Sequence, residues 1–270
     1  MAIHPTAIVD RRAELAHDVE VGPFCVIEGE VRIEAGCRLY QNVYVTGWTE
    51  IGERCELHPG VIVGHAPQDA KYRGERSYCR IGPGTILREH VTIHRGTTPD
   101  SETVVGANGF LLGGSHVAHN CALGERVTLI NNVLLGGHVT VGDGTTLGGG
   151  AVVQQFVRVG EQVMAPGNAR VIQDIIPFAL LDVEGRIAGL NRVGLRRAGF
   201  TADQVRNIRE GYRLLFGSDL PFSRAVVQLA ETAIGPPVDR IIHFLQQESC
   251  RGTAGRSRRR RPDSSESPAL

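Results

Sequence analysis

Apolar residues recur at every sixth position over residues 3–63, 81–93 and 105–171. The gaps between these runs are themselves multiples of six residues, so every apolar anchor shares one phase. A short fixed period is the sequence signature of a solenoid, in which each repeat buries its apolar face only against neighbouring repeats. The chain is therefore predicted to be mainly β-structure built from stacked coils.

Each hexad carries two further signals. The fourth residue after an anchor is small or β-branched, as at Cys25, and the residue directly after an anchor is often glycine, as at Gly22. Such a pattern predicts a short strand, a tight turn and another short strand. The sequence thus predicts a hexapeptide β-helix over residues 1–176, from which loops protrude near 64–80 and 97–104.

Composition agrees with a narrow, regular interior. Glycine accounts for 34 of the 270 residues, whereas Phe, Tyr and Trp together make up 5%. Stacked coils lie about 4.8 Å apart and bury ladders of like side chains, which leaves no room for large rings on the axis. The pattern resembles that of the left-handed β-helix acyltransferases, whose triangular coils use three hexads. The left hand and the 18-residue coil are implied by that resemblance.

A helical pattern follows the hexads and predicts a C-terminal α-helical domain over residues 177–250. Residues 201–204 resemble a capping box, and the apolar residues of 205–216 fall on one helical face. Ser223 is placed to cap a second helix, and Pro236 to open a third.

The last segment, residues 251–270, is rich in Arg, Ser and Pro and predicts a disordered basic tail. Over the whole chain 29 basic residues balance 29 acidic ones, so the body without this tail is mildly acidic and offers no face suited to nucleic acid. No apolar run is long enough for a membrane span, and the start lacks a secretion signal. We therefore expect a cytoplasmic protein.

A column of polar residues marks a candidate site. Residues 18 apart lie above one another on such coils, so the hexads that begin at 117, 135 and 153 share one face. Their outward residues, with the corner residue that precedes them, are His116, His119, Gly137, His138, Gln154 and Gln155. Histidine can act as a base near neutral pH, and backbone N–H groups at glycines can stabilise an oxyanion. Because no Ser or Cys stands beside a His in a recognisable motif, we expect direct transfer without an acyl-enzyme.

Four motifs make the resemblance specific. In chain order they span residues 68–75, 91–97, 116–121 and 194–200, and they include the run His-Val-Ala-His-Asn-Cys. Together they resemble the UDP-N-acetylglucosamine O-acyltransferases, which catalyse the first step of lipid A synthesis. The similarity extends over roughly residues 3–245.

The resemblance implies a homotrimer with active sites between neighbouring β-helices. It implies transfer of a 3-hydroxyacyl chain from acyl carrier protein, presented as a phosphopantetheine thioester co-substrate, to the 3-hydroxyl of UDP-N-acetylglucosamine. His119 falls on the general base, and the Gly137 N–H on the oxyanion donor. No metal site and no other cofactor are expected. The predicted substrate-binding residues are Gln68, Asp69, Lys71, His94, His116, Asn120, His138, Gln154, Gln155, Gly167, Asn191 and Arg197.

Three of these positions carry a more specific implication. Asp69 and Lys71 fall on the loop that reaches the nucleotide sugar from the adjacent chain. Lys71 is the sole lysine, which suits a point-charge partner for phosphate or substrate. Gly167 falls on the position associated with acyl-chain length, and its missing side chain implies room for a long chain.

Two residues depart from the family pattern. Asn120 stands where the family has Asp directly after the base; an amide still accepts a hydrogen bond from imidazole but cannot stabilise imidazolium by charge. The difference is on the order of 1 kcal/mol. Gln154 stands where the family usually has His, which leaves the acceptor open between the N-acetyl sugar and its 3-amino analogue.

Three alternatives stay open on the sequence. One is a related sugar-nucleotide N-acyltransferase that acts on an amino sugar. A second is a β-helix of the γ-carbonic-anhydrase type, with zinc held by His116, His119 and His138 at subunit contacts; Lys71 has no role there. The third is a non-catalytic scaffold, which the Asn120 departure keeps open.

Overall fold

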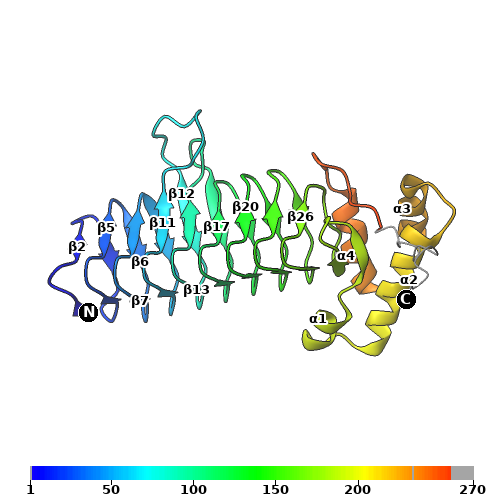
Figure 1. The fold of residues 1–270 in the computed structure, drawn as a ribbon, viewed down its shortest axis with the longest axis horizontal. Coiled ribbons are helices and arrows are strands. Elements are labelled where there is room, and N and C mark those ends of the chain that lie inside the picture. Colours follow the sequence, from blue (N-terminus) through cyan, green and yellow to red (C-terminus); the bar gives the residue numbers. More distant parts are fainter. Residues whose placement is uncertain (1, 233, 257–270) are drawn as a thin grey trace, which may run out of the picture.

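The computed structural model describes residues 2–232 and 234–256. Over most of its length the chain forms a left-handed parallel β-helix with three sheets, and helices gather at its C-terminal end (Figure 1). The prediction of fold class is confirmed. The strand pairs are stacked with residues 18 apart in register, for example Thr128 beside Thr146. At the loops the register instead steps by 30 or 24 residues, as for Glu56 beside Ile86 and Thr92 beside His116.

The eleven-stranded sheet contains β1 (Ala2–Ile3), β4 (Glu20–Val21), β7 (Arg38–Leu39), β10 (Glu56–Leu57), β13 (Ile86–Leu87), β16 (Phe110–Leu111), β19 (Thr128–Leu129), β22 (Thr146–Leu147), β25 (Met164–Ala165), β27 (Ala179–Leu181) and β28 (Ile187–Leu190). The nine-stranded sheet contains β2 (Ile8–Val9), β5 (Val26–Glu28), β8 (Tyr44–Thr46), β11 (Ile62–His65), β14 (Thr92–His94), β17 (His116–Val117), β20 (Leu134–Leu135), β23 (Val152–Val153) and β26 (Arg170–Val171). The eight-stranded sheet contains β3 (Glu14–Leu15), β6 (Val31–Ile33), β9 (Trp48–Ile51), β12 (Tyr78–Ile81), β15 (Glu102–Val105), β18 (Ala122–Leu123), β21 (Thr140–Val141) and β24 (Arg158–Val159).

The hexad anchors form the core. All of them are buried except Ile3, Val9 and Leu15, which belong to the first coil and have no coil beneath them. The interior of the coils is filled by Val, Ile, Leu and small residues. The largest fully buried side chain, Phe178, lies where the coils end, and its ring packs edge-on against Phe200 at 5.6 Å. An aromatic ring thus closes the axis instead of occupying it.

Two loops leave the corner between the nine-stranded and eight-stranded sheets. The longer one joins β11 to β12 and rises above the coils (Figure 1), and the other joins β14 to β15. Arg95 ties them together, because its guanidinium donates to the carbonyl oxygen of Gly64 (2.7 Å) and to the Tyr72 hydroxyl (2.8 Å). The root of the long loop is therefore fixed on the coil that carries His94.

The C-terminal region contains α1 (Arg192–Arg197), α2 (Ala202–Gly217), α3 (Phe222–Glu231) and α4 (Pro236–Gln246). The capping box of α2 is confirmed, since the Thr201 and Gln204 side chains each bond the other's backbone N–H. The cap predicted at Ser223 is wrong: α3 begins at Phe222 with Pro221 at its N-cap and no side-chain cap. The antiparallel pair β27–β28 was not predicted. No helix within the described ranges is long and apolar enough to cross a membrane.

Residues 251–256 differ from the predicted disordered tail. They form isolated bridges with the last coil, at Thr253 beside Asp174, and with β28, at Arg256 beside Ile187, and Ala254 is buried. The physical reason is that the end of a β-helix exposes backbone N–H and C=O groups, which this segment pairs. The prediction of disorder is therefore wrong for these residues, and positions 257–270 lie outside the described ones.

Candidate active site

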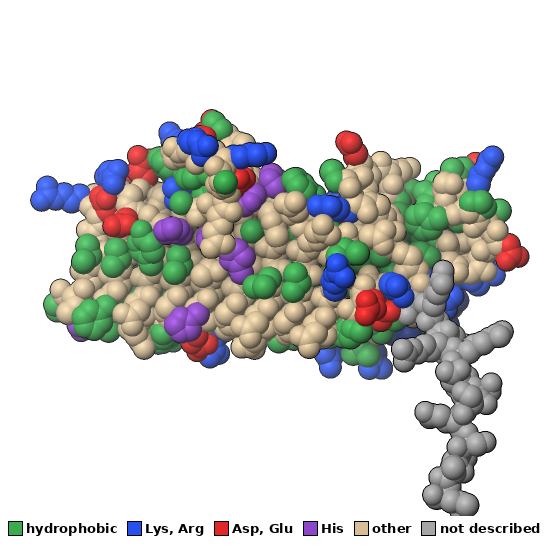
Figure 2. Space-filling view, turned by 45° about the horizontal axis from the view of Figure 1, so that its top comes forward, with side chains coloured by type: hydrophobic (Ala, Val, Ile, Leu, Met, Phe, Trp, Pro, Cys, Tyr) green, Lys and Arg blue, Asp and Glu red, His purple; other side chains and the backbone are tan. Residues whose placement is uncertain are grey.

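Four histidines meet on the nine-stranded sheet and at the corner that follows it. His94 ends β14, His116 begins β17, and His119 and His138 lie on the turns after β17 and β20. The rings of His94 and His116 lie 4.9 Å apart, and those of His119 and His138 lie 5.2 Å apart and perpendicular. Figure 2 shows histidines gathered on the face below the protruding loop. The polar column predicted from the hexads is thus present.

Asn120 fixes the ring of His119. Its Oδ1 accepts hydrogen bonds from the Thr97 backbone N–H (3.1 Å) and the Thr97 hydroxyl (2.9 Å), and it lies 2.9 Å from His119 Nδ1. A backbone N–H can only donate, so the atom that faces it must be the amide oxygen. Because that oxygen can only accept, Nδ1 carries the hydrogen, and the neutral ring keeps its Nε2 lone pair for a substrate.

The backbone conformation at position 120 also favours asparagine. It adopts a left-handed conformation with φ 59° at the corner of its hexad, and Asn is among the non-glycine residues that tolerate this region best. The chain uses the same residue type at the same hexad position, again with positive φ, at Asn42, Asn108, Asn132 and Asn168. An amide in place of a carboxylate therefore fits the corner without local strain beyond that of its neighbours.

Gly137 lies one coil above His119. A Cβ atom built on it would lie 2.4 Å from Cε1 and 2.6 Å from Nε2 of His119, so only glycine allows the ring this position. The Gly137 N–H donates no hydrogen bond within residues 2–232 and 234–256. The residues predicted as base and as oxyanion donor are therefore close neighbours.

The imidazoles around His119 are held in their neutral form. Burial, and next the neighbouring His116, lower the pKa of His94 to about 4. Burial and then His119 also lower the pKa of both His116 and His138, while Asp69 of the long loop opposes this at His138. A cluster of uncharged rings near pH 7 can exchange hydrogen bonds with substrate without repelling a proton on His119.

Buried His94 makes the fold sensitive to acid. Its folded-state pKa of about 4 lies below the ordinary value of 6.5. Between these two pH values His94 binds a proton in the unfolded chain but not in the folded chain, so the free energy of unfolding falls as pH drops from 6.5 through 4. We expect the free energy of unfolding to fall by on the order of 2 kcal/mol per chain over this window, after allowance for solvent screening. Thermal unfolding at a series of pH values between 7 and 4 measures this fall in the free energy of unfolding.

The matched variants are His94→Phe, which keeps a ring but cannot titrate, and His4→Phe at an exposed position. The first should reduce the acid dependence and leave the part that His116 and His138 contribute through their own lowered pKa values, and the second should keep it in full. An acid dependence that is the same in His94→Phe and wild type contradicts the assignment.

The remaining predicted residues of this corner lie around the histidines. Gln154 and Gln155 are exposed on the coil above Gly137. On the long loop, the Lys71 backbone N–H donates to Asp69 Oδ1 at 2.9 Å, and the Lys71 side chain is exposed, as is Gln68. These side chains are free to meet a ligand.

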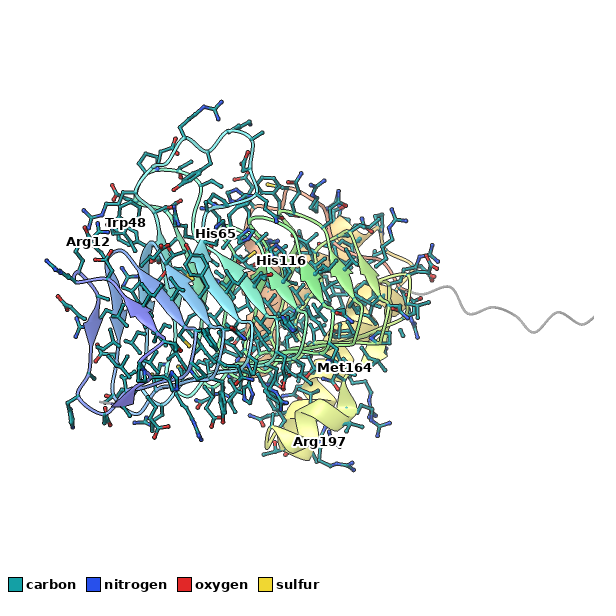
Figure 3. The ribbon with its side chains drawn as sticks, turned by 60° about the vertical axis from the view of Figure 1, so that its left-hand side comes forward. Arg12, Trp48, His65, His116, Met164 and Arg197 are labelled. Carbon is teal, nitrogen blue, oxygen red and sulfur yellow. The ribbon has the colours of Figure 1, made fainter. Side chains whose placement is uncertain are left out.

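Three predicted residues are not brought to His119 within one chain. Arg197 lies on α1, well away from His116 along and below the coils (Figure 3). Asn191 caps α1, where its amide accepts from the Gly194 N–H (3.0 Å) and donates to the Gln162 carbonyl (2.8 Å). Gly167 lies on the turn after β25 of the eleven-stranded sheet, where a Cβ would meet only Gly149 O at 3.3 Å. They can serve this site only from a neighbouring chain.

Sequence reasoning missed the threonines that position the histidines. The Thr92 hydroxyl lies 2.7 Å from His116 Nδ1, and the Thr103 hydroxyl accepts from the Asn120 backbone N–H at 2.8 Å. Thr97 stands in the motif over 91–97, but nothing in the motif says that it meets Asn120. The 24-residue step across the second loop brings Thr92 to His116, whereas Thr103 meets Asn120 where the ordinary 18-residue step resumes after that loop.

The zinc alternative finds no support within one chain. Among residues 2–232 and 234–256, no three His, Cys, Asp or Glu side chains are grouped so that they could hold a metal ion. Such a site would need ligands from more than one chain.

Known proteins resemble this chain over nearly its whole length. Residues 174–254 match the family model described as UDP N-acetylglucosamine O-acyltransferase, domain 2. Relatives named acyl-[acyl-carrier-protein]–UDP-N-acetylglucosamine O-acyltransferase include those of Thermodesulfovibrio yellowstonii, 37% identical over 90% of this chain and 95% of the relative, and Bartonella henselae, 38% identical over 92% of each.

Solved structures agree with these sequences. The UDP-N-acetylglucosamine acyltransferase of Francisella novicida superposes with a TM-score of 0.91 at 31% identity and covers 94% of each chain. That of Campylobacter jejuni gives a TM-score of 0.87 at 33% identity, over 94% of this chain and 100% of the other.

Proposed function

The chain belongs to the acyl-[acyl-carrier-protein]–UDP-N-acetylglucosamine O-acyltransferase family, an enzyme family, and we propose that its histidine corner performs this acyl transfer in lipid A synthesis. The donor is a 3-hydroxyacyl thioester on acyl carrier protein, and the acceptor is the sugar 3-hydroxyl. The observation that carries the proposal is that the His119 ring, held by Asn120, lies so close to Gly137 that no side chain would fit at residue 137.

The first step uses the free Nε2 of His119 as general base. It removes the proton of the sugar 3-hydroxyl while that oxygen bonds to the thioester carbonyl carbon. The carbonyl electron pair moves to its oxygen, and the Gly137 N–H donates to the resulting oxyanion. The neutral rings of His116 and His138 leave His119 the group that takes the proton.

The second step returns the same proton. The oxyanion collapses to an ester, the carbon–sulfur bond breaks, and the His119 imidazolium protonates the departing thiolate. No covalent acyl-enzyme forms, and no metal or organic cofactor takes part beyond the phosphopantetheine arm of the donor. Asn120 orients the imidazolium through Nδ1 but adds no negative charge to it.

The assembly that we propose is a homotrimer. Asn191, Arg197 and Gly167 lie away from His119 within one chain, and a neighbouring chain packed along the β-helix would bring its own copies of them to the histidine corner. Asp69 and Lys71 would reach the nucleotide sugar from the long loop of the adjacent chain. A cytoplasmic location stays a prediction.

The direct test is an acyl-transfer assay. Purified protein is incubated with 3-hydroxyacyl carrier protein and either UDP-N-acetylglucosamine or its 3-amino analogue. Formation of the O-acyl product supports the proposal, and preference for the 3-amino acceptor favours the N-acyltransferase alternative that Gln154 leaves open. If neither product forms while an active relative gives product in the same assay, the proposal is overturned in favour of a non-catalytic scaffold.

Replacing Asn120 by Asp should raise activity. A carboxylate accepts the same hydrogen bonds from Thr97 and His119, and it also stabilises the imidazolium that forms during transfer. The gain of on the order of 1 kcal/mol corresponds to about a fivefold increase in kcat.

Asn132→Asp is the matched control, because Asn132 has the same left-handed backbone at the same hexad position. It should leave kcat unchanged. A decrease in kcat for Asn120→Asp would mean that the amide is required as such.

A further inference from the structure

The segment 249–254 is held rigidly against the end of the β-helix. The Ser249 hydroxyl accepts a hydrogen bond from the Gly252 N–H at 2.8 Å. Asp174 pairs with the segment on both sides, donating its N–H to the Gly252 carbonyl (2.8 Å) and accepting from the Ala254 N–H (2.8 Å). The backbone of Arg251 is therefore fixed although it lies in a region whose composition predicts disorder.

A buried ion pair reinforces this attachment. The Asp174 side chain is fully buried, and its carboxylate accepts from the backbone N–H and from Nε of Arg158, both at 2.8 Å. Arg158 also donates to the Phe244 carbonyl in α4 at 3.2 Å. The last coil, α4 and the C-terminal segment thus share one anchor.

From this fixed backbone, the Arg251 side chain points to the candidate site. Its Nε donates to the Gln155 carbonyl at 2.9 Å, and its guanidinium carbon lies 5.9 Å from the centre of the Phe156 ring. That ring stacks on His138 with centres 4.6 Å apart and planes 13° apart. Since His138 in turn meets His119 edge-on, a chain of contacts joins Arg251 to the proposed base.

The backbone makes a second link between the same residues. The peptide between Gln155 and Phe156 accepts from Arg251 through its C=O, and its N–H donates to the Gly137 carbonyl at 3.0 Å. The next peptide, between Gly137 and His138, donates its N–H to the His119 carbonyl, also at 3.0 Å. A cation at the end of aligned peptide hydrogen bonds strengthens each bond in the series.

The turns in this series need such support. Phe156 and His138 have φ values of 66° and 61°, in the left-handed region that side chains other than Gly, Asn and Asp rarely adopt. Conformations of this kind persist only where the surroundings hold them. Arg251 makes no ion pair within the described ranges, so its charge is not committed elsewhere.

We propose that Arg251 is a positioning residue for the acyl transfer: it holds Phe156 on His138 and the Gly137–His138 turn against His119. This inference rests on the proposed function of the histidine corner. Arg251 itself touches neither the base nor the oxyanion donor. It acts through Phe156 and through the peptide that precedes it.

The kinetic test compares Arg251→Ala with two companions in the full chain. A small displacement of a catalytic group costs about tenfold to a hundredfold, so we expect kcat to fall by about tenfold with both KM values within about twofold. Arg251→Lys should recover part of the loss, because an ammonium can still reach the Gln155 carbonyl. Arg256→Ala, in the same segment, should leave kcat and both KM values as in wild type.

A double variant then tests whether Arg251 acts through Phe156, because losses of kcat along one chain of contacts do not multiply. Phe156→Leu removes the planar stack on His138 and should reduce kcat by a similar factor. If both residues act through one chain of contacts, the double variant should be no slower than the slower single variant. Multiplicative losses, a change confined to KM, or full activity in Arg251→Ala would each overturn the proposal.

A measurement without turnover separates this inference from the proposed function. Burial is the first cause of the lowered pKa of His138, so release of Phe156 should hydrate that ring and raise its pKa, as followed by NMR of labelled histidine. A rise in Arg251→Ala but not in Arg256→Ala supports positioning even if wild type fails the acyl-transfer assay. An unchanged His138 titration in Arg251→Ala overturns it even if the assay succeeds.

Discussion

Loss of the His119 side chain should lower kcat by about three orders of magnitude, which is within the range measured for removal of a positioned general base. The neighbouring rings cannot replace it. His116 is bonded to Thr92 through Nδ1, and His138 meets His119 edge-on with Phe156 stacked on its face. The measurement is initial rate with saturating acyl carrier protein thioester and nucleotide sugar.

His119→Ala should fold normally. Asn120 keeps both hydrogen bonds from Thr97, and its backbone N–H still donates to the Thr103 hydroxyl. The thermal midpoint and the oligomeric state should therefore match those of wild type. His4→Ala, at an exposed position, controls for the loss of an imidazole as such. Turnover in His119→Ala within tenfold of wild type would remove His119 as the base.

The fold could be predicted because its information is local and repeated. Each hexad carries its own anchor and small inward residue, and an error of one residue in phase would expose every anchor. The anchors from Val21 to Val171 are all buried, so the lattice read from the sequence is the lattice of the structure. His119 and Gly137 are 18 residues apart within the uninterrupted hexads of 105–171, so the repeat alone predicts that one lies above the other.

The contacts that position the site were not predictable in the same way. Thr97 meets Asn120 across 23 residues, and Arg251 meets Gln155 across 96. Neither pair has a periodic relation, because one partner of each lies on a loop or beyond the last coil. Composition was misleading for residues 251–256: an Arg- and Gly-containing segment reads as disordered unless the exposed end of the β-helix that it covers is known.

The same distinction explains the helical region. The α2 capping box depends on two residues three apart, so it is visible in sequence. The start of α3 at Phe222 depends on the turn at Pro221, and β27–β28 depends on pairing with β25. Local chemistry was sufficient for the first and insufficient for the others.

Gly137→Ala should reduce kcat by about a hundredfold while the fold is retained. The added methyl would lie 2.4 Å from Cε1 of His119, far inside van der Waals contact, so the ring must move off its present position. The clash is with a side chain that can rotate, and Gly137 is not among the residues with positive φ. The base is displaced from the oxyanion donor, whereas the backbone keeps its conformation.

Gly113→Ala is the matched control, because Gly113 occupies the same hexad position and its nearest neighbour is the Asn131 side-chain nitrogen at 3.2 Å. Both variants should show similar thermal midpoints, and only Gly137→Ala should lose turnover. If the two variants lost activity equally, the effect would belong to the coil and not to the contact with His119. Full activity in Gly137→Ala would show that His119 works from another position, and the proposed pairing of base and oxyanion donor would be wrong.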